Sequence, residues 1–523
     1  MSKQGAVARA AQRARGGTCV LMVVIGLLIT GCKVGPNYAP PAIGLKPEFS
    51  MAEQPRFRGE LADVRAWWRY LEDPYLDQLV AHLLDQNLTL RQAGLRVLEA
   101  QARLIVARGG LFPQTQTMTG NYAQSKISST NANFFSQPGI FVPNLWPQNV
   151  STAFNFNWEL DFWGRFRRLI ESSDANLGAA VAAQDEVMVL LLAEMTSTYV
   201  EMRTCEYRLR LVTRNLELQR KTLELAERKR KSGVATATDV GQAQANVGQA
   251  GAQLPVLETQ RRQACHRLCV LLGREPVDLY VELGATGRIP QPPMELAVGI
   301  PVDLVRRRPD VRRAERELAS QCARIGFALT DFYPHFFLTG ALGVSSHSFN
   351  KLFEEASLIG LIAPSFSWNI LNYFRIKANV EAEKAAFARL EAAYRQTILV
   401  ALREAEDAQV AYALSYDRAK WFDIAVAGSQ AAVDEADKTF ERGTTESGRV
   451  YILQSELLRQ QDQLAIANAT IAQNLIALFR ALGGGWELRL PCAPQLAPPT
   501  SPPPGPVVLL APEFSEQPAT VLR

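Results

Sequence analysis

The chain has 523 residues, of which 47% are hydrophobic, 21% charged and 8% aromatic, enough to bury several compact cores or one elongated core. Its formal charge of +4 comes from four basic residues among the first 31, because the rest of the chain carries equal numbers of basic and acidic side chains. This balance gives no support to a nucleic-acid partner, which would call for a basic surface.

The first 31 residues have the pattern of a secretion signal, with basic residues followed by the apolar run CVLMVVIGLLIT at 19–30. The sequence LITGC then places small residues directly before Cys32, which is the pattern of a bacterial lipoprotein. The thiol of Cys32 is therefore predicted to carry a diacylglycerol, whose acyl chains would hold the mature chain on a membrane surface. Aspartate after such a cysteine typically retains a lipoprotein at the inner membrane, so Lys33 favours the outer membrane.

The seven cysteines do not predict a disulfide framework, because only five remain once the signal and Cys32 are set aside. Cys265, His266 and Cys269 lie within five residues, and the two sulfurs would be one helical turn apart. With no second pair of ligands nearby, we interpret them as small side chains on a packed helical face. The sequence predicts no metal and no other cofactor.

The chain is internally duplicated. At an offset of 221 residues, 91–113 aligns with 312–334, and at an offset of 210, Phe156 and Trp158 align with Phe366 and Trp368. The predicted segments are a signal peptide (1–31), an acylated N-terminal linker (32–72), a first repeat (73–273), an equatorial linker (274–301), a second repeat (302–483) and a Pro-rich tail (484–523).

Each repeat has the same predicted elements in chain order. A helix of about 35 residues ends at an aromatic–proline pair, and two strands follow, separated by a loop. A helical stretch of about 65 residues then starts at Arg165 or Arg375, runs to a turn at Gly233 or Gly443, and returns along a second helix. At ~1.5 Å per residue, such a stretch spans roughly 100 Å, which suits a coiled-coil-like rod or wall and not a compact domain.

The strands have two chemically different faces and are about ten residues long, which suits a tilted transmembrane strand. The apolar row, predicted to face lipid, comprises Phe154, Phe156 and Trp158, with Phe366 and Trp368 in the second repeat. The polar row, predicted to face a water-filled lumen, comprises Asn155, Asn157, Glu159 and Asp161. A half-buried strand of a soluble sheet alternates in the same way, but the very long attached helices argue against that reading.

Four strands cannot stand alone in a bilayer, because their open edges would leave backbone N–H and C=O groups unsatisfied. Two copies would give eight strands, a barrel filled by its own side chains, whereas three copies give twelve strands around a lumen. A conduit therefore favours a trimer.

Several motifs resemble one known family, the outer-membrane efflux factors with TolC-like channels, in its lipoprotein branch. CKVGPNY at 32–38 is similar to the acylated start of that branch, and WWRYLEDPYLDQLV with NLTLRQA, within 67–93, resembles its first helix. GIPVDLVRRRPDVRRAE at 299–315 resembles the most specific signature of the family, and FYPHFFLTGALG at 332–343 resembles its third strand. The resemblance covers about residues 32–490.

This resemblance implies a membrane α+β fold: a homotrimer with a 12-stranded β-barrel in the outer membrane, continued by a long periplasmic α-helical barrel. It implies a periplasmic adaptor (membrane fusion) protein and a proton-driven RND-type pump of the inner membrane as partners. The channel itself would be passive and not an enzyme, consistent with four scattered histidines and no nucleophile–base set in the sequence.

The resemblance also places the closed end of the channel at the periplasmic tip, near Gly233 and Gly443. Asp239 has the position of an acidic residue that can ring the aperture, and it equally fits a helix cap three residues after Thr236. Arg449 stands where related channels tend to have aspartate, which predicts a mixed ring of Arg–Asp pairs in place of a purely acidic one.

Other functions remain open beside that of an export conduit for drugs and other toxic compounds. One is a lipid-anchored structural protein that bridges envelope layers, and another is the channel of a metal-ion efflux or type I secretion system. Conductance across a planar bilayer separates a conduit from a bridge.

Overall fold

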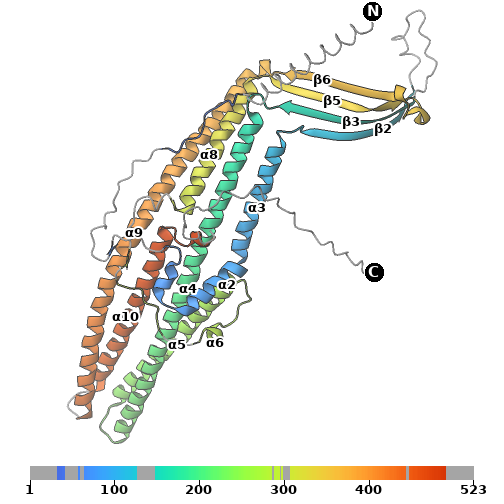
Figure 1. The fold of residues 1–523 in the computed structure, drawn as a ribbon. Coiled ribbons are helices and arrows are strands. Elements are labelled where there is room, and N and C mark those ends of the chain that lie inside the picture. Colours follow the sequence, from blue (N-terminus) through green and yellow to red (C-terminus); the bar gives the residue numbers. More distant parts are fainter. Residues whose placement is uncertain are drawn as a thin grey trace, which may run out of the picture.

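The computed structural model describes residues 32–41, 57–58, 64–126, 148–284, 288–294, 296–297, 307–442 and 447–489. The predicted signal peptide, Gly443 and the tail after Arg489 lie outside these residues. Figure 1 shows an elongated molecule with a four-stranded sheet at one end and long helices that run side by side away from it.

The sheet is antiparallel, and its strand order follows the chain. Its strands are β2 (Thr115–Gln124), β3 (Gln148–Leu160), β5 (His335–Ser346) and β6 (Leu358–Ser367). Each repeat contributes one neighbouring pair, so β2 and β6 form the two edges. A small parallel pair, β1 (Phe57–Arg58) with β4 (Leu296–Ala297), lies apart from this sheet.

Beneath the sheet the helices stand in the order α3, α4, α8 and α9, which matches the order of the strands that they join (Figure 1). The longer helices are α2 (Pro74–Gln86), α3 (Leu88–Gly109), α4 (Arg165–Lys231), α5 (Ala237–Leu271), α8 (Pro309–Leu329), α9 (Tyr373–Glu441) and α10 (Ser447–Ala481). The short ones are η1 (Trp67–Leu71), α6 (Tyr280–Leu283), η3 (Thr330–Phe332), η4 (Phe349–Lys351), η5 (Glu355–Ser357), η6 (Ile370–Asn372) and η7 (Trp486–Arg489).

The helix expected at the start of each repeat is shorter than predicted. In the first repeat it divides at Asn87, whose side chain accepts a hydrogen bond from the Leu90 N–H (2.8 Å) and donates one to the Leu271 carbonyl (2.7 Å). The asparagine therefore ends α2 and caps α3 in one step. In the second repeat α8 has 21 residues and η3 completes the path to the strand.

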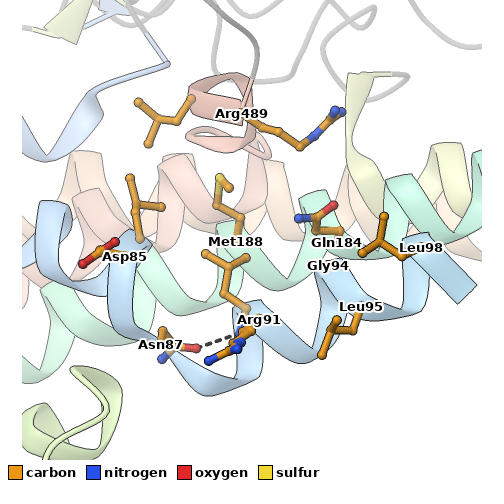
Figure 2. Close-up of a pocket in the computed structure, with 12 residues that line it drawn as sticks. Asp85, Asn87, Arg91, Gly94, Leu95, Leu98, Gln184, Met188 and Arg489 are labelled. Carbon is orange, nitrogen blue, oxygen red and sulfur yellow. Dashed lines mark hydrogen bonds between the residues drawn. The ribbon is translucent and has the colours of Figure 1, made fainter. Parts of the chain in front are cut away.

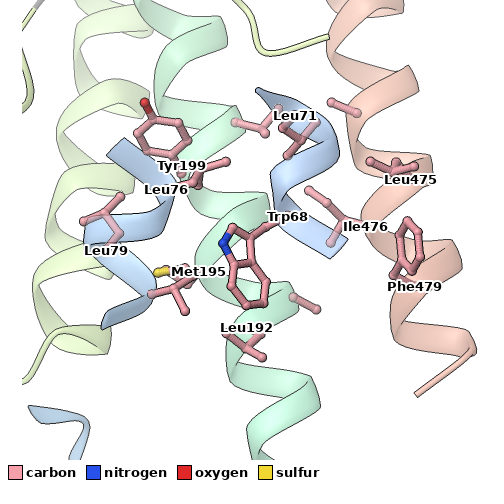
Figure 3. Close-up of a cluster of buried hydrophobic side chains, with 14 of the residues drawn as sticks. Trp68, Leu71, Leu76, Leu79, Leu192, Met195, Tyr199, Leu475, Ile476 and Phe479 are labelled. Atoms are coloured by element: carbon pink, nitrogen blue, oxygen red, sulfur yellow. The ribbon is translucent and has the colours of Figure 1, made fainter. Parts of the chain in front are cut away.

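The principal core lies halfway along the helices, where the 3₁₀ turn η1 and α2 pack across α4, α5 and α10. Figure 3 shows Trp68 and Leu71 between the helix that carries Leu192 and Met195 and the helix that carries Phe479. The Trp67 ring stacks on Phe479 at 5.6 Å between centroids. This cluster fixes the two repeats against each other, because α4 belongs to the first and α10 to the second.

Among the residues that the structure describes, two helices, α4 and α10, contain windows apolar enough to cross a membrane by length and composition alone. Both windows are roughly half buried within the chain, since α4 packs on α3, α5, α8 and α10. Their apolar residues therefore belong to helix–helix packing in this fold.

Candidate functional site

The strand register gathers apolar side chains on one face of the sheet. That face carries Met118, Tyr122, Phe154, Phe156, Trp158, Leu160, Phe336, Leu338, Leu342, Val344, Leu358, Ile362 and Phe366. Several are strongly exposed in the single chain, including Ile362 at 75% and Phe366 at 69%. A continuous exposed apolar face of this kind calls for an apolar surrounding.

The opposite face is mainly polar across β2, β3 and β5, although β5 also turns Phe337 to it, and its polar side chains bond from strand to strand. Asn155 donates to the Thr119 hydroxyl (2.9 Å), and the Thr339 hydroxyl donates to Asn157 (3.2 Å). The edge strand β6 differs, because it turns the apolar residues Ile359 and Leu361 to this face. The polar row of Asn155, Asn157 and Glu159 thus lies on the side away from Phe154 and Phe156.

Glu159, the last acidic residue of β3, is held by basic partners at the point where strands meet helices. Its carboxylate lies 2.7 Å from Nδ1 of His335 and 3.9 Å from Nε of Arg165. Arg165 also forms an ion pair with Asp331. The sequence identified Glu159 as a polar side chain but gave no sign of His335, which lies 176 residues further along the chain.

Asp161 was predicted to belong to the polar row, but it lies outside the strand, because β3 ends at Leu160. Its carboxylate accepts hydrogen bonds from the N–H groups of Phe166 (2.9 Å) and Arg167 (3.2 Å) and from Nε of Arg167 (2.9 Å). It therefore caps the start of α4, where the free N–H groups of a helix favour a carboxylate.

The duplicated tryptophans hold equivalent places in the two repeats. The indole N–H of Trp158 donates to the Leu111 carbonyl (3.1 Å), and that of Trp368 donates to the Phe332 carbonyl (3.0 Å). Trp368 lies one residue beyond the end of β6, so it does not belong to the strand row to which the sequence assigned it. In both repeats the tryptophan ties the end of one strand to the turn before the preceding strand.

At the far end of the helices, the turn between α4 and α5 contains Gly233 with φ of 75°, a conformation that favours glycine. Thr236 and Asp239 then form a reciprocal capping box at the start of α5: the Thr236 N–H donates to Asp239 (2.8 Å), and the Asp239 N–H donates to the Thr236 hydroxyl (3.2 Å). Arg449 is exposed in the first turn of α10. Gly443, the residue predicted at the turn before α10, is not among the described residues.

The segment that follows Cys32, here called the strap, crosses the ends of α4 and α8 that lie nearest the sheet. Arg168 of α4, fully buried, donates to the carbonyls of Val34 (2.9 Å) and Gly35 (2.7 Å), and the Val34 N–H donates to the Trp163 carbonyl (3.1 Å). Lys33 pairs with Glu171 at 2.6 Å. Cys32 is exposed, and the next residue, Lys33, lies against Gly164 between β3 and α4. The sequence did not predict that Arg168 binds the segment that follows Cys32.

The cysteine cluster is packed in the helical core. Cys265 and Cys269 are fully buried, while His266 is exposed between them. Burial raises the pKa of the Cys265 thiol to about 11, which keeps it protonated at neutral pH and a poor metal ligand. Within the described ranges, no three His, Cys, Asp or Glu side chains are arranged to hold a metal ion.

The cavities are surface grooves between helices. One of about 480 Å³ lies between α3, α4 and η7, with Leu95, Leu98, Met188 and Arg489 among its lining residues (Figure 2). A second, of about 650 Å³, lies between the α4–α5 hairpin and α10, with Asn and Gln side chains on the hairpin and mixed polar and apolar side chains on α10. The second groove also contains Ser455, but the two carboxylates that line it are engaged by arginines, Glu456 by Arg459 and Asp462 by Arg208.

Comparison with known proteins gives one consistent result. A family model described as outer membrane efflux protein matches residues 79–274 and 300–484. Nodulation protein T of Rhizobium leguminosarum bv. viciae is 30% identical over 477 residues, covering 91% of this chain and 94% of the relative. The pyoverdine export outer membrane protein OpmQ of Pseudomonas putida is 29% identical over 482 residues, covering 90% and 98%. The solved structure of the outer-membrane channel OprN superposes with a TM-score of 0.80 at 30% identity, covering 87% of this chain and all of the other.

Proposed function

Because this chain belongs to the outer membrane efflux protein family, we propose that it is the outer-membrane channel of an efflux system, a passive conduit through which small molecules leave the cell. Three copies close a 12-stranded β-barrel, and their helices continue it as a long helical barrel into the periplasm. Members of the family are channel proteins and not enzymes.

One observation carries the proposal: a four-stranded amphipathic sheet with two open edges continues directly into helices of 67 and 69 residues. The open edges require further copies, and the exposed apolar face requires lipid. We assign the row of Phe154, Phe156 and Phe366 to the lipid side and the row of Asn155, Asn157 and Glu159 to the lumen. The helices, at ~1.5 Å per residue, are long enough to cross roughly 100 Å of periplasm.

We place the periplasmic aperture at the tip, where the hairpin of α4 and α5 packs on α10 through Ala226, Val240 and Tyr451. Asp239 and Arg449 both lie within one or two turns of this contact, on α5 and α10 respectively. Trimer symmetry would repeat them three times around the axis, so that Arg449 of one hairpin can meet an acidic residue of another. Such exposed pairs weaken as salt increases.

Purified protein in a planar bilayer tests both the channel and the aperture. We expect the wild type to give discrete conductance steps, and Arg449→Ala to give larger steps or more frequent opening, with the difference shrinking at high salt. Arg403→Ala, an exposed change on α9 at a distance from the tip, is the matched control and should behave as wild type. A silent bilayer would refute the channel, whereas an Arg449→Ala conductance equal to wild type would refute only the mixed ring.

We also assign the tip as the end that meets a periplasmic adaptor and, through it, an RND-type pump of the inner membrane. Arg228, Arg230 and Lys231 at the end of α4 are exposed there and add positive charge to the tip, whereas Lys229 lies over the Phe440 ring, 3.5 Å from its centroid. The pyoverdine export relative acts, by its name, on a small organic molecule. A small organic molecule, selected by the pump, is therefore the proposed cargo.

We propose that Cys32 is acylated and anchors the mature chain to the outer membrane. The strap supports this assignment, because it holds an exposed cysteine at the level where the sheet gives way to helices. Acyl chains on Cys32 would enter the same membrane leaflet as the periplasmic rim of the barrel.

Labelling with radioactive palmitate tests the anchor. Wild-type protein should take up label, and Cys32→Ser should not, because the substitution removes the thiol that receives the diacylglycerol. The buried Cys322→Ser serves as control and should be labelled as wild type. Equal labelling of Cys32→Ser and wild type would contradict the assignment without touching the channel.

A further inference from the structure

The two edge helices of the chain each carry an exposed stripe. On α3 it is large and apolar and recurs at heptad spacing: Leu88, Leu95, Leu98, Ala102 and Ile105. Its four large side chains are 56–62% exposed. At ~100° per residue, this stripe lies roughly opposite Leu90, Ala93, Leu104 and Ala107, the buried positions of α3. Since α3 packs on α4 through those buried positions, the stripe lies on the exposed side of α3, where Leu95 and Leu98 also border the groove between α3, α4 and η7.

On α9 the corresponding stripe is made mostly of small residues. It contains Ala378, Ala382, Ala385, Ala392 and Leu399, all exposed and again at heptad spacing. The buried positions of the upper part of α9, among them Ile376, Val380, Tyr394 and Ile398, lie roughly opposite. Each stripe includes one arginine, Arg91 or Arg389, whose long side chain can carry its charge out to water.

Barrel closure brings these two stripes together. The chain runs from α3, which ends at Gly109, into β2, and from β6 into α9, which begins at Tyr373. Both helices therefore stand at the edges of the row of helices, below the two edge strands (Figure 1). When β2 of one copy pairs with β6 of the next, α3 comes to lie beside α9 of that next copy. A helix within a closed wall has neighbours on two opposite sides, which is where α3 and α9 place their buried positions and their stripes.

We propose that the leucine stripe of α3 packs into the alanine stripe of α9 in the next copy, forming a large-into-small seam that joins the copies beneath the barrel. Small residues on one helix leave room for large ones on the other, as in knobs-into-holes packing. The levels agree: Leu98 lies roughly 16 Å below the membrane end of α3, and Ala382 and Ala385 lie roughly 14 and 18 Å below that of α9. The seam rests on the trimeric channel proposed above.

Disulfide cross-linking in the outer membrane tests the seam. The full chain carrying Leu98→Cys and Ala385→Cys, with Cys492→Ser to remove a competing thiol, should form covalent dimers and trimers on oxidation. Ala386→Cys in place of Ala385→Cys is the matched control, because it sits at the same level but about 100° around the helix. Cross-linking should be lost with it. Equal yields at the two positions would overturn the proposed seam.

A size swap gives a second test that does not depend on oxidation. Leu98→Ala should leave a gap in the seam, and Ala385→Leu should overpack it. Each single variant should therefore lower the temperature at which the trimers dissociate on heating. The double variant Leu98→Ala with Ala385→Leu should dissociate at a temperature close to that of the wild type. If it is no better than the worse single variant while trimers and conductance persist, the seam is wrong and the channel stands. If no trimers form even in wild type, the proposed function itself fails.

Discussion

Gly343→Ala is expected to abolish most of the folded trimer, because β5 has no room for a side chain at this position. An ideal Cβ there would lie 2.3 Å from the carbonyl oxygen of Thr152 and 2.5 Å from Cα of Ala153, both in the backbone of the paired strand β3. Backbone atoms cannot rotate away as a side chain can, so the two repeats would have to separate where β3 meets β5. Overpacking of this kind costs about 1–3 kcal/mol per chain, and a trimer pays it three times.

The measurement is the fraction of protein that migrates as a heat-sensitive trimer when outer membranes are loaded on a gel without boiling. Gly120→Ala in β2 of the same sheet is the matched control, because a Cβ there has nothing within 4 Å in the chain. Gly340→Ala should be intermediate, since the three atoms nearest to its Cβ all belong to the Phe156 ring, which can shift. If the Gly343 and Gly120 variants assemble equally well, the close approach of β3 and β5 does not limit assembly.

The sequence predicted well those features that repeat locally. Alternation along 154–160 gave the two faces of β3, and the helical period gave α4 with its start at Arg165. The duplication gave the order of elements in the second half. The alternating pattern did not predict where the strands end: it continues through Asp161 and Trp368, yet β3 ends at Leu160 and β6 at Ser367, and Asp161 instead caps α4.

Interactions between distant parts of the chain had no signal in the sequence. Arg168 binds a segment more than 130 residues away, and His335 meets Glu159 across 176 residues. One arginine among several in a long charged helix looks the same whether it is solvated or buried, and only the packed structure distinguishes the two. The same holds for Asn87, which reads as an ordinary helix residue until its bond to the Leu271 carbonyl is seen.

Asp185 is the clearest case, and its replacement has the second large expected effect. This α4 carboxylate is fully buried and accepts two hydrogen bonds from Arg489 of η7 (2.7 and 3.2 Å) and one from Arg312 of α8 (3.3 Å). The Arg312 guanidinium also lies over the Trp486 ring, 4.7 Å from its centroid. One side chain of the first repeat therefore holds both a helix of the second repeat, α8, and the turn η7 that follows α10.

Asp185→Ala should destabilise each chain by about 3–5 kcal/mol, because it leaves two partly buried arginines facing each other without the carboxylate between them. Urea unfolding of the purified protein, followed by tryptophan fluorescence, should show the midpoint falling accordingly, since Trp486 reports on this site. Glu435→Ala, which removes an exposed pair with Lys438 on α9, should change stability by no more than about 0.5 kcal/mol. Equal midpoints for the two variants would mean that the Asp185 cluster does not hold the repeats together. A selective loss in Asp185→Ala would identify a single buried charge as one of the links between the two halves of the duplicated chain, beside the hydrophobic core and the pairing of β3 with β5.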